Sequence, residues 1–205
     1  MKLKPSKIVC VGLNYRDHAA EMGLPIPASP VIFLKPPSAV IYDGDDILYP
    51  PQTKELHYEA ELGLVIKDRI KNIAVQEARS HILGYICAND VTARDLQRLD
   101  GQWGRAKSFD TFCVLGEQVA AGIDPDDLVI KLYLNGQLKQ NSRTAQMIFK
   151  VDQLVAFISS VMTLEAGDVI LTGTPPGIGP MEIGDEVVVE IEGIGRLTNR
   201  VKGES

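Results

Sequence analysis

The chain has 205 residues, of which 45% are hydrophobic and 23% charged, so it fits one large soluble domain or at most two small ones. Its net charge is -6, from 21 lysines and arginines against 27 aspartates and glutamates, and its basic residues are scattered, which argues against a nucleic-acid partner. No apolar run approaches the roughly 18–20 residues that cross a bilayer, so no membrane association is expected.

Strand patterns dominate the chain from beginning to end. They are short apolar or β-branched runs closed by Gly, Pro, Asp or Asn, at 7–12, 31–35, 57–66, 82–89, 111–116, 128–136, 168–173 and 185–193. Asn135-Gly136 predicts a type I′ hairpin turn. Because regular helices do not separate the strands, we expect a compact β-rich α+β domain over residues 1–205.

One helix is clearly indicated, from Val151 to about Met162, by its apolar stripe and the Gly167-Asp168 pair that follows it. Shorter helices are predicted over 15–22, 75–82 and 92–96. The three cysteines, Cys10, Cys87 and Cys113, lie in apolar runs without metal-ligand spacing, so we expect buried reduced thiols and a cytoplasmic protein.

Two acids stand close together in the stretch HYEAELGLVI, residues 57–66. Glu59 and Glu61 are two apart on a predicted strand, so both point to one face, roughly 6–7 Å apart along the strand. The opposite face is apolar, and two like charges beside a core repel each other. Taken alone, the pattern is more typical of an edge strand whose acids face solvent.

A third acid, Asp90, ends the apolar strand LGYICAND, residues 83–90, where a cleft can open beside the core. If Asp90 meets Glu59 and Glu61, the three carboxylates cannot all stay ionised without a cation or raised pKa values. Oxygen ligands without His or Cys suit a hard divalent ion, Mg²⁺ first and then Mn²⁺ or Ca²⁺.

A histidine and a glutamate share one face of the predicted helix at 15–22. His18 and Glu21 are three residues apart, and a carboxylate beside an imidazole sets its tautomer and raises its basicity, as in a general base that activates water. A surface ion pair explains the same spacing.

Two further segments carry polar groups suited to catalysis or ligand binding. Arg94 and Gln97 follow Asp90, and Lys107 lies among aromatic residues, either as a surface side chain or as a cation for a developing oxyanion. The stretch LTGTPPGIGP, residues 171–180, lacks the Lys-Ser/Thr of a phosphate-binding loop. Its amides and the hydroxyls of Thr172 and Thr174 could hold a small carboxylate, or the stretch is a plain turn.

The order of these motifs resembles the fumarylacetoacetate hydrolase family, in particular its small members similar to acylpyruvate hydrolase and oxaloacetate decarboxylase. The matching stretches are VGLNYRDHAAEM, PVIFLKPPSAV, HYEAELGLVI, ANDVTARDLQ, AKSFDTFCVLG and GDVILTGTPPGIGP, and the resemblance runs from Lys7 to about Val189. It implies a single catalytic domain of rolled mixed β-sheets with few short helices, usually a homodimer.

The resemblance also implies a role for each candidate residue. The implied metal ligands are Glu59, Glu61 and Asp90. The implied catalytic residues are His18, Glu21, Lys107 and Gln97. The implied substrate-binding residues are Lys35, Arg94 and Thr174.

The implied substrate is a small 2-oxo acid, and the implied reaction passes through an enolate. Hydrolysis of a C–C bond in an acylpyruvate is the preferred reaction, because His18 and Glu21 together suit water activation. Oxaloacetate decarboxylation, isomerisation of 2-hydroxyhepta-2,4-diene-1,7-dioate and keto–enol tautomerisation of oxaloacetate remain alternatives. A non-catalytic metal-binding protein is the alternative from another class.

Overall fold

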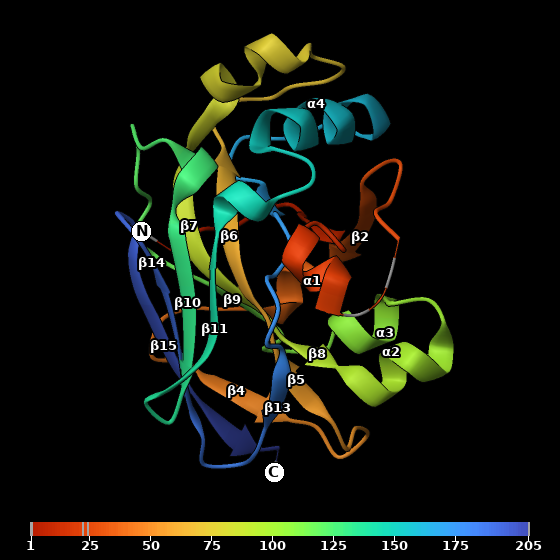
Figure 1. The fold of residues 1–205 in the computed structure, drawn as a ribbon, viewed down its shortest axis with the longest axis vertical. Helices are drawn as coiled ribbons and strands as arrows, with labels where there is room; N and C mark the ends of the chain where they lie inside the picture. Colours follow the sequence, from red (N-terminus) through yellow and green to blue (C-terminus); the bar gives the residue numbers. More distant parts are fainter. Residues whose placement is uncertain (1, 22, 24, 205) are drawn as a thin grey trace.

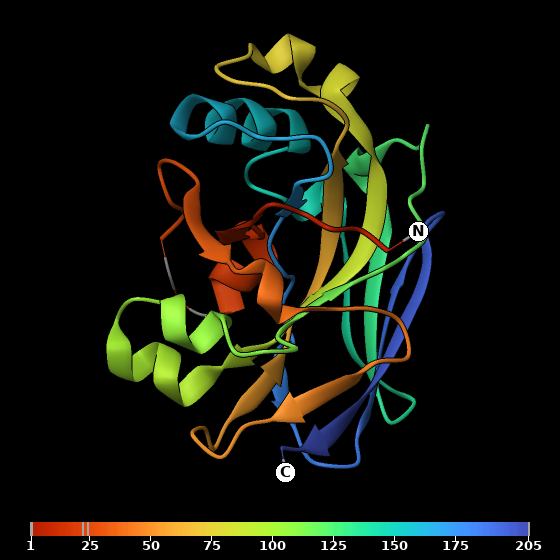
Figure 2. The same cartoon turned by 180° about the vertical axis from the view of Figure 1, so that it is seen from behind.

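The structure is a computed structural model that describes residues 2–21, 23 and 25–204. These residues form three β-sheets with a few short helices around them (Figure 1). The view from behind in Figure 2 shows the same arrangement, with α4 (Val151–Val161) and the 3-10 helix η2 (Val75–His81) together at one end.

The largest sheet is mixed and carries the buried centre of the molecule. Its strand order is β2 (Val31–Lys35), β1 (Ile8–Gly12), β12 (Val169–Leu171), β6 (Ala60–Ile66), β7 (Ile82–Asp90), β9 (Cys113–Leu115), β3 (Val40–Ile41). Strands β1 and β12 are parallel, whereas β6 pairs antiparallel with β7 and with β12. Every residue of β6 is buried, because the sheet is covered on both faces.

The second sheet packs across this core with one face and meets solvent with the other. Its order is β11 (Gln137–Arg143), β10 (Val129–Leu134), β14 (Glu186–Ile191), β15 (Gly195–Gly203), β4 (Asp46–Tyr49). Along β14 the buried residues Val187, Val189 and Ile191 alternate with more exposed ones, the period of a half-buried strand.

A small third sheet and the helices complete the chain. The sheet joins β13 (Gly179–Met181), β5 (Leu56–Tyr58) and β8 (Thr92–Ala93). The remaining helices are α1 (Arg16–Glu21), α2 (Arg94–Asp100) and α3 (Gly104–Lys107), with 3-10 turns η1 (Pro37–Ala39), η3 (Pro125–Asp127) and η4 (Thr144–Gln146). Figure 1 shows α2 and α3 side by side along one flank.

The predicted β-rich α+β fold is confirmed, and its curled mixed sheets match the expected type. The hairpin between β10 and β11 turns at Asn135 and Gly136, whose φ angles of 51° and 75° are those of a type I′ turn. The three cysteines are free and buried, as predicted.

Three local predictions need correction or completion. The segment predicted as a helix over 75–82 is the 3-10 helix η2. The segment 92–96 begins as strand β8, which pairs with β5, and becomes helical only at Arg94. Helix α1 spans Arg16–Glu21, and Met22, the predicted last residue, lies outside the described residues.

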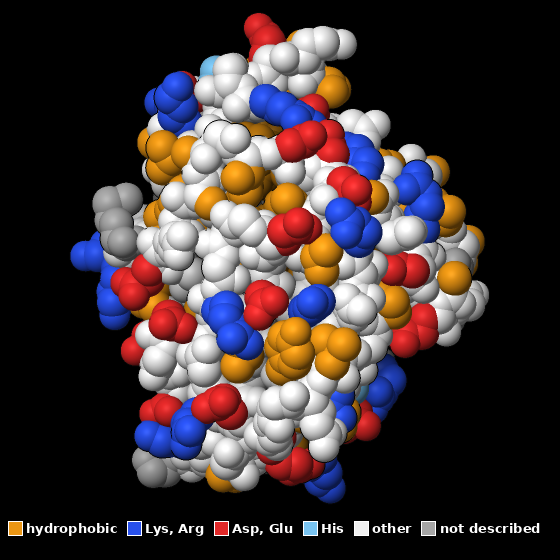
Figure 3. All heavy atoms as spheres, turned by 60° about the vertical axis from the view of Figure 1, so that its left-hand side comes forward, with side chains coloured by type: hydrophobic (Ala, Val, Ile, Leu, Met, Phe, Trp, Pro, Cys, Tyr) orange, Lys and Arg blue, Asp and Glu red, His pale blue; other side chains and the backbone are white. Residues whose placement is uncertain are grey.

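The surface carries both charge signs. Figure 3 shows Lys and Arg side chains interspersed with Asp and Glu on the face that it brings forward, rather than gathered in one basic field. None of the helices in the described part of the chain is long and apolar enough to cross a membrane.

Candidate functional site

Three carboxylates meet where the antiparallel pair β6–β7 ends. Glu59 occupies the single residue between β5 and β6, Glu61 follows on β6, and Asp90 is the last residue of β7. The Asp90 amide donates to the Glu59 carbonyl at 2.9 Å, which holds the two strands in register there. The three side chains are buried, and one ligand oxygen from each lies within 4.8 Å of the others.

Two buried lysines neutralise part of this cluster. The ammonium of Lys107, on α3, donates to Glu59 Oε2 at 2.8 Å and to Asp90 Oδ2 at 2.7 Å. The ammonium of Lys35, at the end of β2, pairs with Asp90 Oδ1 and donates to the Val91 carbonyl at 3.0 Å. Asp90 is therefore held between two cations.

A guanidinium holds the other side of Glu59. Arg94, the first residue of α2, pairs with Glu59 Oε1 and donates from Nη1 to Gln97 Oε1 at 2.5 Å. Burial acts to raise the pKa of Glu59, but Lys107 and Arg94 outweigh it and hold this pKa at about 2.

Glu61 differs from its two neighbours, because it has no Lys or Arg ion-pair partner among the described residues. Its Oε2 accepts a hydrogen bond of 2.7 Å from the Gly173 amide in the loop after β12. Burial, followed by Asp90 and Glu59, raises the pKa of Glu61 well above its usual range. One carboxylate of the cluster thus lacks the positive charge that would keep it ionised.

The donor chemistry fits a hard divalent cation. Three buried carboxylate oxygens within 4.8 Å of one another, without His or Cys, are the ligand set that Mg²⁺ and Mn²⁺ prefer. A cation bound there would supply the charge that Glu61 lacks.

The predicted histidine–glutamate pair is formed on α1. His18 Nδ1 lies 3.0 Å from Glu21 Oε2. The His18 side chain is buried and lines the same cavity as the carboxylates, whereas Glu21 is exposed and accepts from the Gly177 amide at 3.2 Å. With Nδ1 donating to Glu21, Nε2 is the ring nitrogen left to exchange a proton in the cavity.

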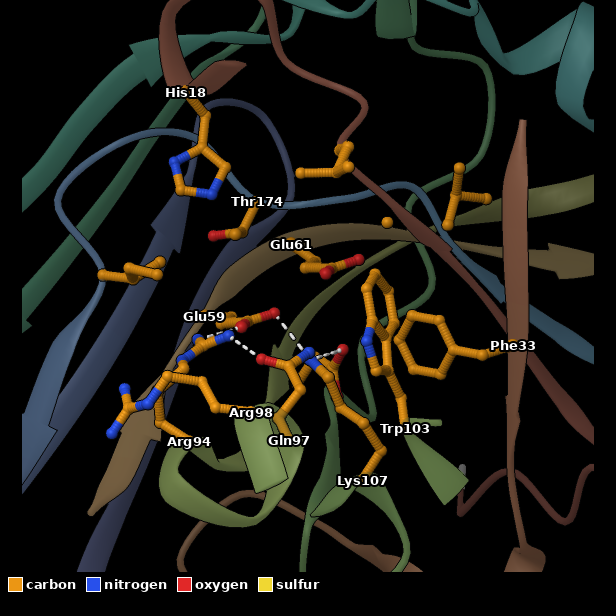
Figure 4. Close-up of a pocket in the computed structure, with 15 residues that line it drawn as sticks. His18, Phe33, Glu59, Glu61, Arg94, Gln97, Arg98, Trp103, Lys107 and Thr174 are labelled. Carbon is orange, nitrogen blue, oxygen red and sulfur yellow. Dashed lines mark hydrogen bonds and ion pairs between the residues drawn. The ribbon is translucent and has the colours of Figure 1, made fainter. Parts of the chain in front are cut away.

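The cavity above the carboxylates has a volume of about 250 Å³ (Figure 4). Its polar lining comes from His18, Glu59, Glu61, Asp90, Arg94, Gln97, Arg98, Lys107 and Thr174. Phe33 and Trp103 form one wall, with ring centroids 5.2 Å apart and planes at 75°. Gly12 makes room for this wall, because a Cβ there would lie 2.5 Å from the Trp103 ring.

The structure brings eight of the ten predicted site residues to the lining of this cavity. Glu21 does not line it but contacts His18, and Lys35 does not line it because its ammonium lies against Asp90 and the Val91 carbonyl. In this position Lys35 holds the carboxylate of Asp90. Thr174 lines the cavity, and its hydroxyl accepts from Gln140 Nε2 at 2.9 Å.

Sequence reasoning missed several residues that shape the site. Gln140, on β11, accepts from the Ala60 amide at 2.9 Å and so ties β11 to the strand that carries Glu61. Asn89 accepts from the Glu59 amide at 2.9 Å. Only the unusual Trp103, the one tryptophan of the chain, gave a signal in the sequence, as part of an aromatic segment around Lys107.

Comparisons with known proteins agree with this geometry. The model of the family described as Fumarylacetoacetate (FAA) hydrolase C-terminal matches residues 7–202. An uncharacterized protein of Methanocaldococcus jannaschii is 56% identical over 203 residues, covering 99% of this chain and 86% of that protein. A mitochondrial oxaloacetate tautomerase of Bos taurus is 44% identical, covering 97% of this chain and 67% of that protein.

Two solved structures are similar over the whole chain. A 5-carboxymethyl-2-hydroxymuconate delta-isomerase from Mycobacterium smegmatis is 48% identical with a TM-score of 0.93, covering 99% of this chain and 81% of that one. A fumarylpyruvate hydrolase from Pseudomonas aeruginosa, in complex with Mn²⁺ and pyruvate, is 34% identical with a TM-score of 0.93, covering 100% and 92%.

Proposed function

The chain belongs to the fumarylacetoacetate hydrolase family, and on this premise we propose that it is a divalent-metal-dependent enzyme that acts on a small 2-oxo acid through its enol form. One observation carries the proposal. The buried cluster holds three carboxylates, and Glu61 among them lacks a cationic partner. The neighbour from P. aeruginosa, solved with Mn²⁺ and pyruvate, supports both the kind of ion and the kind of ligand.

Charge counting defines the ligand further. Lys35, Lys107 and Arg94 pair with Glu59 and Asp90 alone, but their three positive charges equal the total charge of three ionised carboxylates. A divalent ion bound beside Glu61 therefore gives the site two net positive charges. The enolate of a 2-oxo acid carries two negative charges, one on its carboxylate and one on its enolate oxygen. The site is therefore complementary to an enolate rather than to the neutral keto group.

Glu59, Glu61 and Asp90 would hold the ion, Mg²⁺ first and Mn²⁺ next. When bound, the ion supplies an electrophile that polarises the 2-oxo group. Lys107 lies within reach of the same position, and its ammonium would donate to the oxygen on which negative charge develops. Thr174 and Gln97 would orient the carboxylate and the carbon chain from opposite sides of the cavity.

Proton movement falls to His18. Its Nε2 would take a proton from the carbon next to the 2-oxo group, while Glu21 stabilises the imidazolium through Nδ1. The imidazolium would then give the proton to the enolate oxygen in tautomerisation, or to another carbon of the conjugated chain in isomerisation. Phe33 and Trp103 would exclude water from one side of the enol. These steps amount to keto–enol tautomerisation or the related double-bond isomerisation of an unsaturated 2-hydroxy acid.

We place tautomerisation or isomerisation first, because relatives named for these reactions are 44% and 48% identical to the chain. Hydrolysis of a C–C bond in an acylpyruvate is the second candidate. It is favoured by the His18–Glu21 pair, which suits activation of water, and by the hydrolase neighbour at 34% identity.

The test is a substrate panel with Mg²⁺ or with chelator. It should contain both tautomers of oxaloacetate, 2-hydroxyhepta-2,4-diene-1,7-dioate, fumarylpyruvate and other acylpyruvates. We expect metal-dependent loss of enol absorbance with oxaloacetate, abolished in Glu61→Gln and kept in Glu190→Gln, a matched change of an acid on the outer sheet. Full activity of metal-stripped protein would contradict metal dependence, and cleavage products alone would put hydrolysis first.

A further inference from the structure

Helix α2 presents a row of three polar side chains to the cavity. Arg94, Gln97 and Arg98 are spaced three and four residues apart, so they lie on one helix face, and all three line the cavity. Figure 4 shows them together below Glu59. The row leads from the carboxylate cluster outward.

The inner members of this row are already engaged with the cluster. Arg94 pairs with Glu59, and Gln97 accepts from Arg94. Arg98 stands four residues beyond Arg94, just over one helical turn and about 6 Å along the axis. Its guanidinium contacts none of the three carboxylates and pairs instead with Glu55, just before β5.

The pair between Arg98 and Glu55 lies at the rim of the cavity. Their side chains are 61% and 41% exposed, so the pair contributes little stability and exchanges partners readily. Lys107 and Arg94, the other lysine and arginine among the described residues that line the cavity, are held by the cluster. Arg98 is therefore the cation available to the far end of a bound ligand.

The distance along the helix matches a short dicarboxylate. A 2-oxo acid of four to six carbons, held by its head at the cluster, places its last carbon roughly one helical turn away. The nonpolar lining, which includes Leu13, Trp103 and Ile178, offers no charge to that end. A distal carboxylate would replace Glu55 on Arg98, and a distal methyl group would not.

We propose that Arg98 is a specificity-determining residue that binds the distal carboxylate of a dicarboxylic 2-oxo acid, with Glu55 as the partner that the substrate displaces. This inference rests on the proposed function, because it takes the head of the ligand to be a 2-oxo acid at the cluster. It predicts that the site binds dicarboxylic 2-oxo acids more tightly than monocarboxylic ones.

The experiment measures binding in Mg²⁺ by the fluorescence of Trp103, the one tryptophan of the chain, which lines the cavity. The probes are 2-oxoglutarate and 2-oxopentanoate, which have equal chain length and differ at the distal end. We expect Arg98→Gln to raise the Kd of 2-oxoglutarate about tenfold, in line with the loss of a hydrogen bond between charged groups at a partly exposed site. The same variant should change the Kd of 2-oxopentanoate less than about twofold. Glu55→Gln should tighten the binding of 2-oxoglutarate and leave the binding of 2-oxopentanoate unchanged.

Arg200→Gln is the matched control. Arg200 pairs with Glu186 at 3.0 Å, and their exposures of 68% and 41% resemble those of Arg98 and Glu55, so the variant removes the same charge away from the cavity. If Arg98→Gln weakened the binding of both probes equally, or weakened neither, this inference would be overturned and the proposed function would stand. Failure of the wild type to bind either probe with Mg²⁺ would overturn the proposed function and the inference with it.

Discussion

Lys107 shows how single residues balance the charge of this site. Its ammonium bridges Glu59 and Asp90, and although burial acts against it, these two acids raise its pKa. A lysine in this position holds the carboxylates together when no divalent ion is bound. It also limits their repulsion.

Lys107→Met should therefore destabilise the metal-free protein more than the Mg²⁺-bound protein. We expect a loss of about 2–3 kcal/mol in chelator, below the roughly 3–5 kcal/mol for a carboxylate left alone, because Arg94 and Lys35 remain. Urea denaturation with chelator and with Mg²⁺ measures the difference. Lys202→Met, which removes an exposed pair with Asp46, is the control, and an equal loss in both conditions would contradict the argument.

Substitutions of His18 and Glu21 distinguish activation of a water molecule from chemistry on the enol alone. If His18 activates water, His18→Ala should slow acylpyruvate cleavage by about 10²–10⁴-fold, the usual contribution of a general base. Oxaloacetate decarboxylation, which needs no attacking water, should slow much less, and Glu21→Gln should show a milder form of this pattern. Steady-state kinetics on both substrates measures it, with oxalate inhibition as the binding control. Equal losses on both substrates would assign His18 to proton transfer at carbon.

At the scale of elements, the parallel pair β1–β12 positions two loops of the site, and Asp168 ties its ends. Asp168 accepts from Ser6 N at 2.9 Å, Ser6 Oγ at 2.7 Å, Lys7 Nζ at 2.5 Å and Glu165 N at 2.8 Å. Burial acts to raise the pKa of Asp168, but these hydrogen bonds outweigh it and lower the pKa.

A lowered carboxylate pKa gives stability that is present above the unfolded value, about 3.9, and is lost as the pH falls through the folded value. Asp168→Asn should therefore destabilise the protein at pH 7 by about 2–3 kcal/mol, the scale of unmade hydrogen bonds to a charged group. The difference in the free energy of unfolding between this variant and the wild type should shrink below about pH 4. Urea midpoints at both pH values test this, with Asp127→Asn as the exposed control, and a pH-independent difference would contradict it.

Elements with a local signal were predictable from the sequence. Asn135-Gly136 encodes its own turn, and the stripe of Val151–Val161 encodes α4. The segment Thr92–Ala93 was misread as helix because its strand character comes from pairing with β5, which local propensity does not report. Gln140 escaped notice for the same reason, since its importance depends on β11 lying against Ala60.

The carboxylate cluster was predictable in part. The spacing of Glu59 and Glu61 predicts a shared face on a strand, and they do converge, although a break at Glu59 separates β5 from β6. The sequence placed Asp90 beside them only as a condition, and the antiparallel pairing of β6 with β7 fulfils it. Lys35 could not be placed by sequence alone, because the side of Asp90 on which it lies depends on the whole sheet.

At the scale of the molecule, we propose that residues 1–205 form one catalytic domain. One hydrophobic core includes Val9 of β1, Leu64 of β6, Leu132 of β10 and Val189 of β14, so the two large sheets share their interior. The cavity is lined from β1, β2, β6, β7, α2 and the loop after β12. Because one core supports all these elements, the site forms only when the whole chain folds.

The outer strand β2 leaves an apolar edge on this domain. In the described residues β2 pairs with β1 on one side and with no strand on the other. Its side chains Val31 and Leu34 are exposed, and Phe33 on the same strand lines the cavity. An open strand edge with exposed apolar side chains favours pairing with another chain, and a second copy is the partner always present at equal concentration.

We therefore expect a homodimer that uses β2, and Leu34→Lys should convert it to a monomer. Leu34 is 48% exposed, and a buried lysine at the interface would lose its hydration without a partner. Leu138→Lys is the matched control, because Leu138 is 49% exposed on β11, the outer strand of the other large sheet. Light scattering at micromolar concentration gives the mass of each variant. A monomeric wild type would refute the dimer, and equal behaviour of the two variants would place its interface elsewhere.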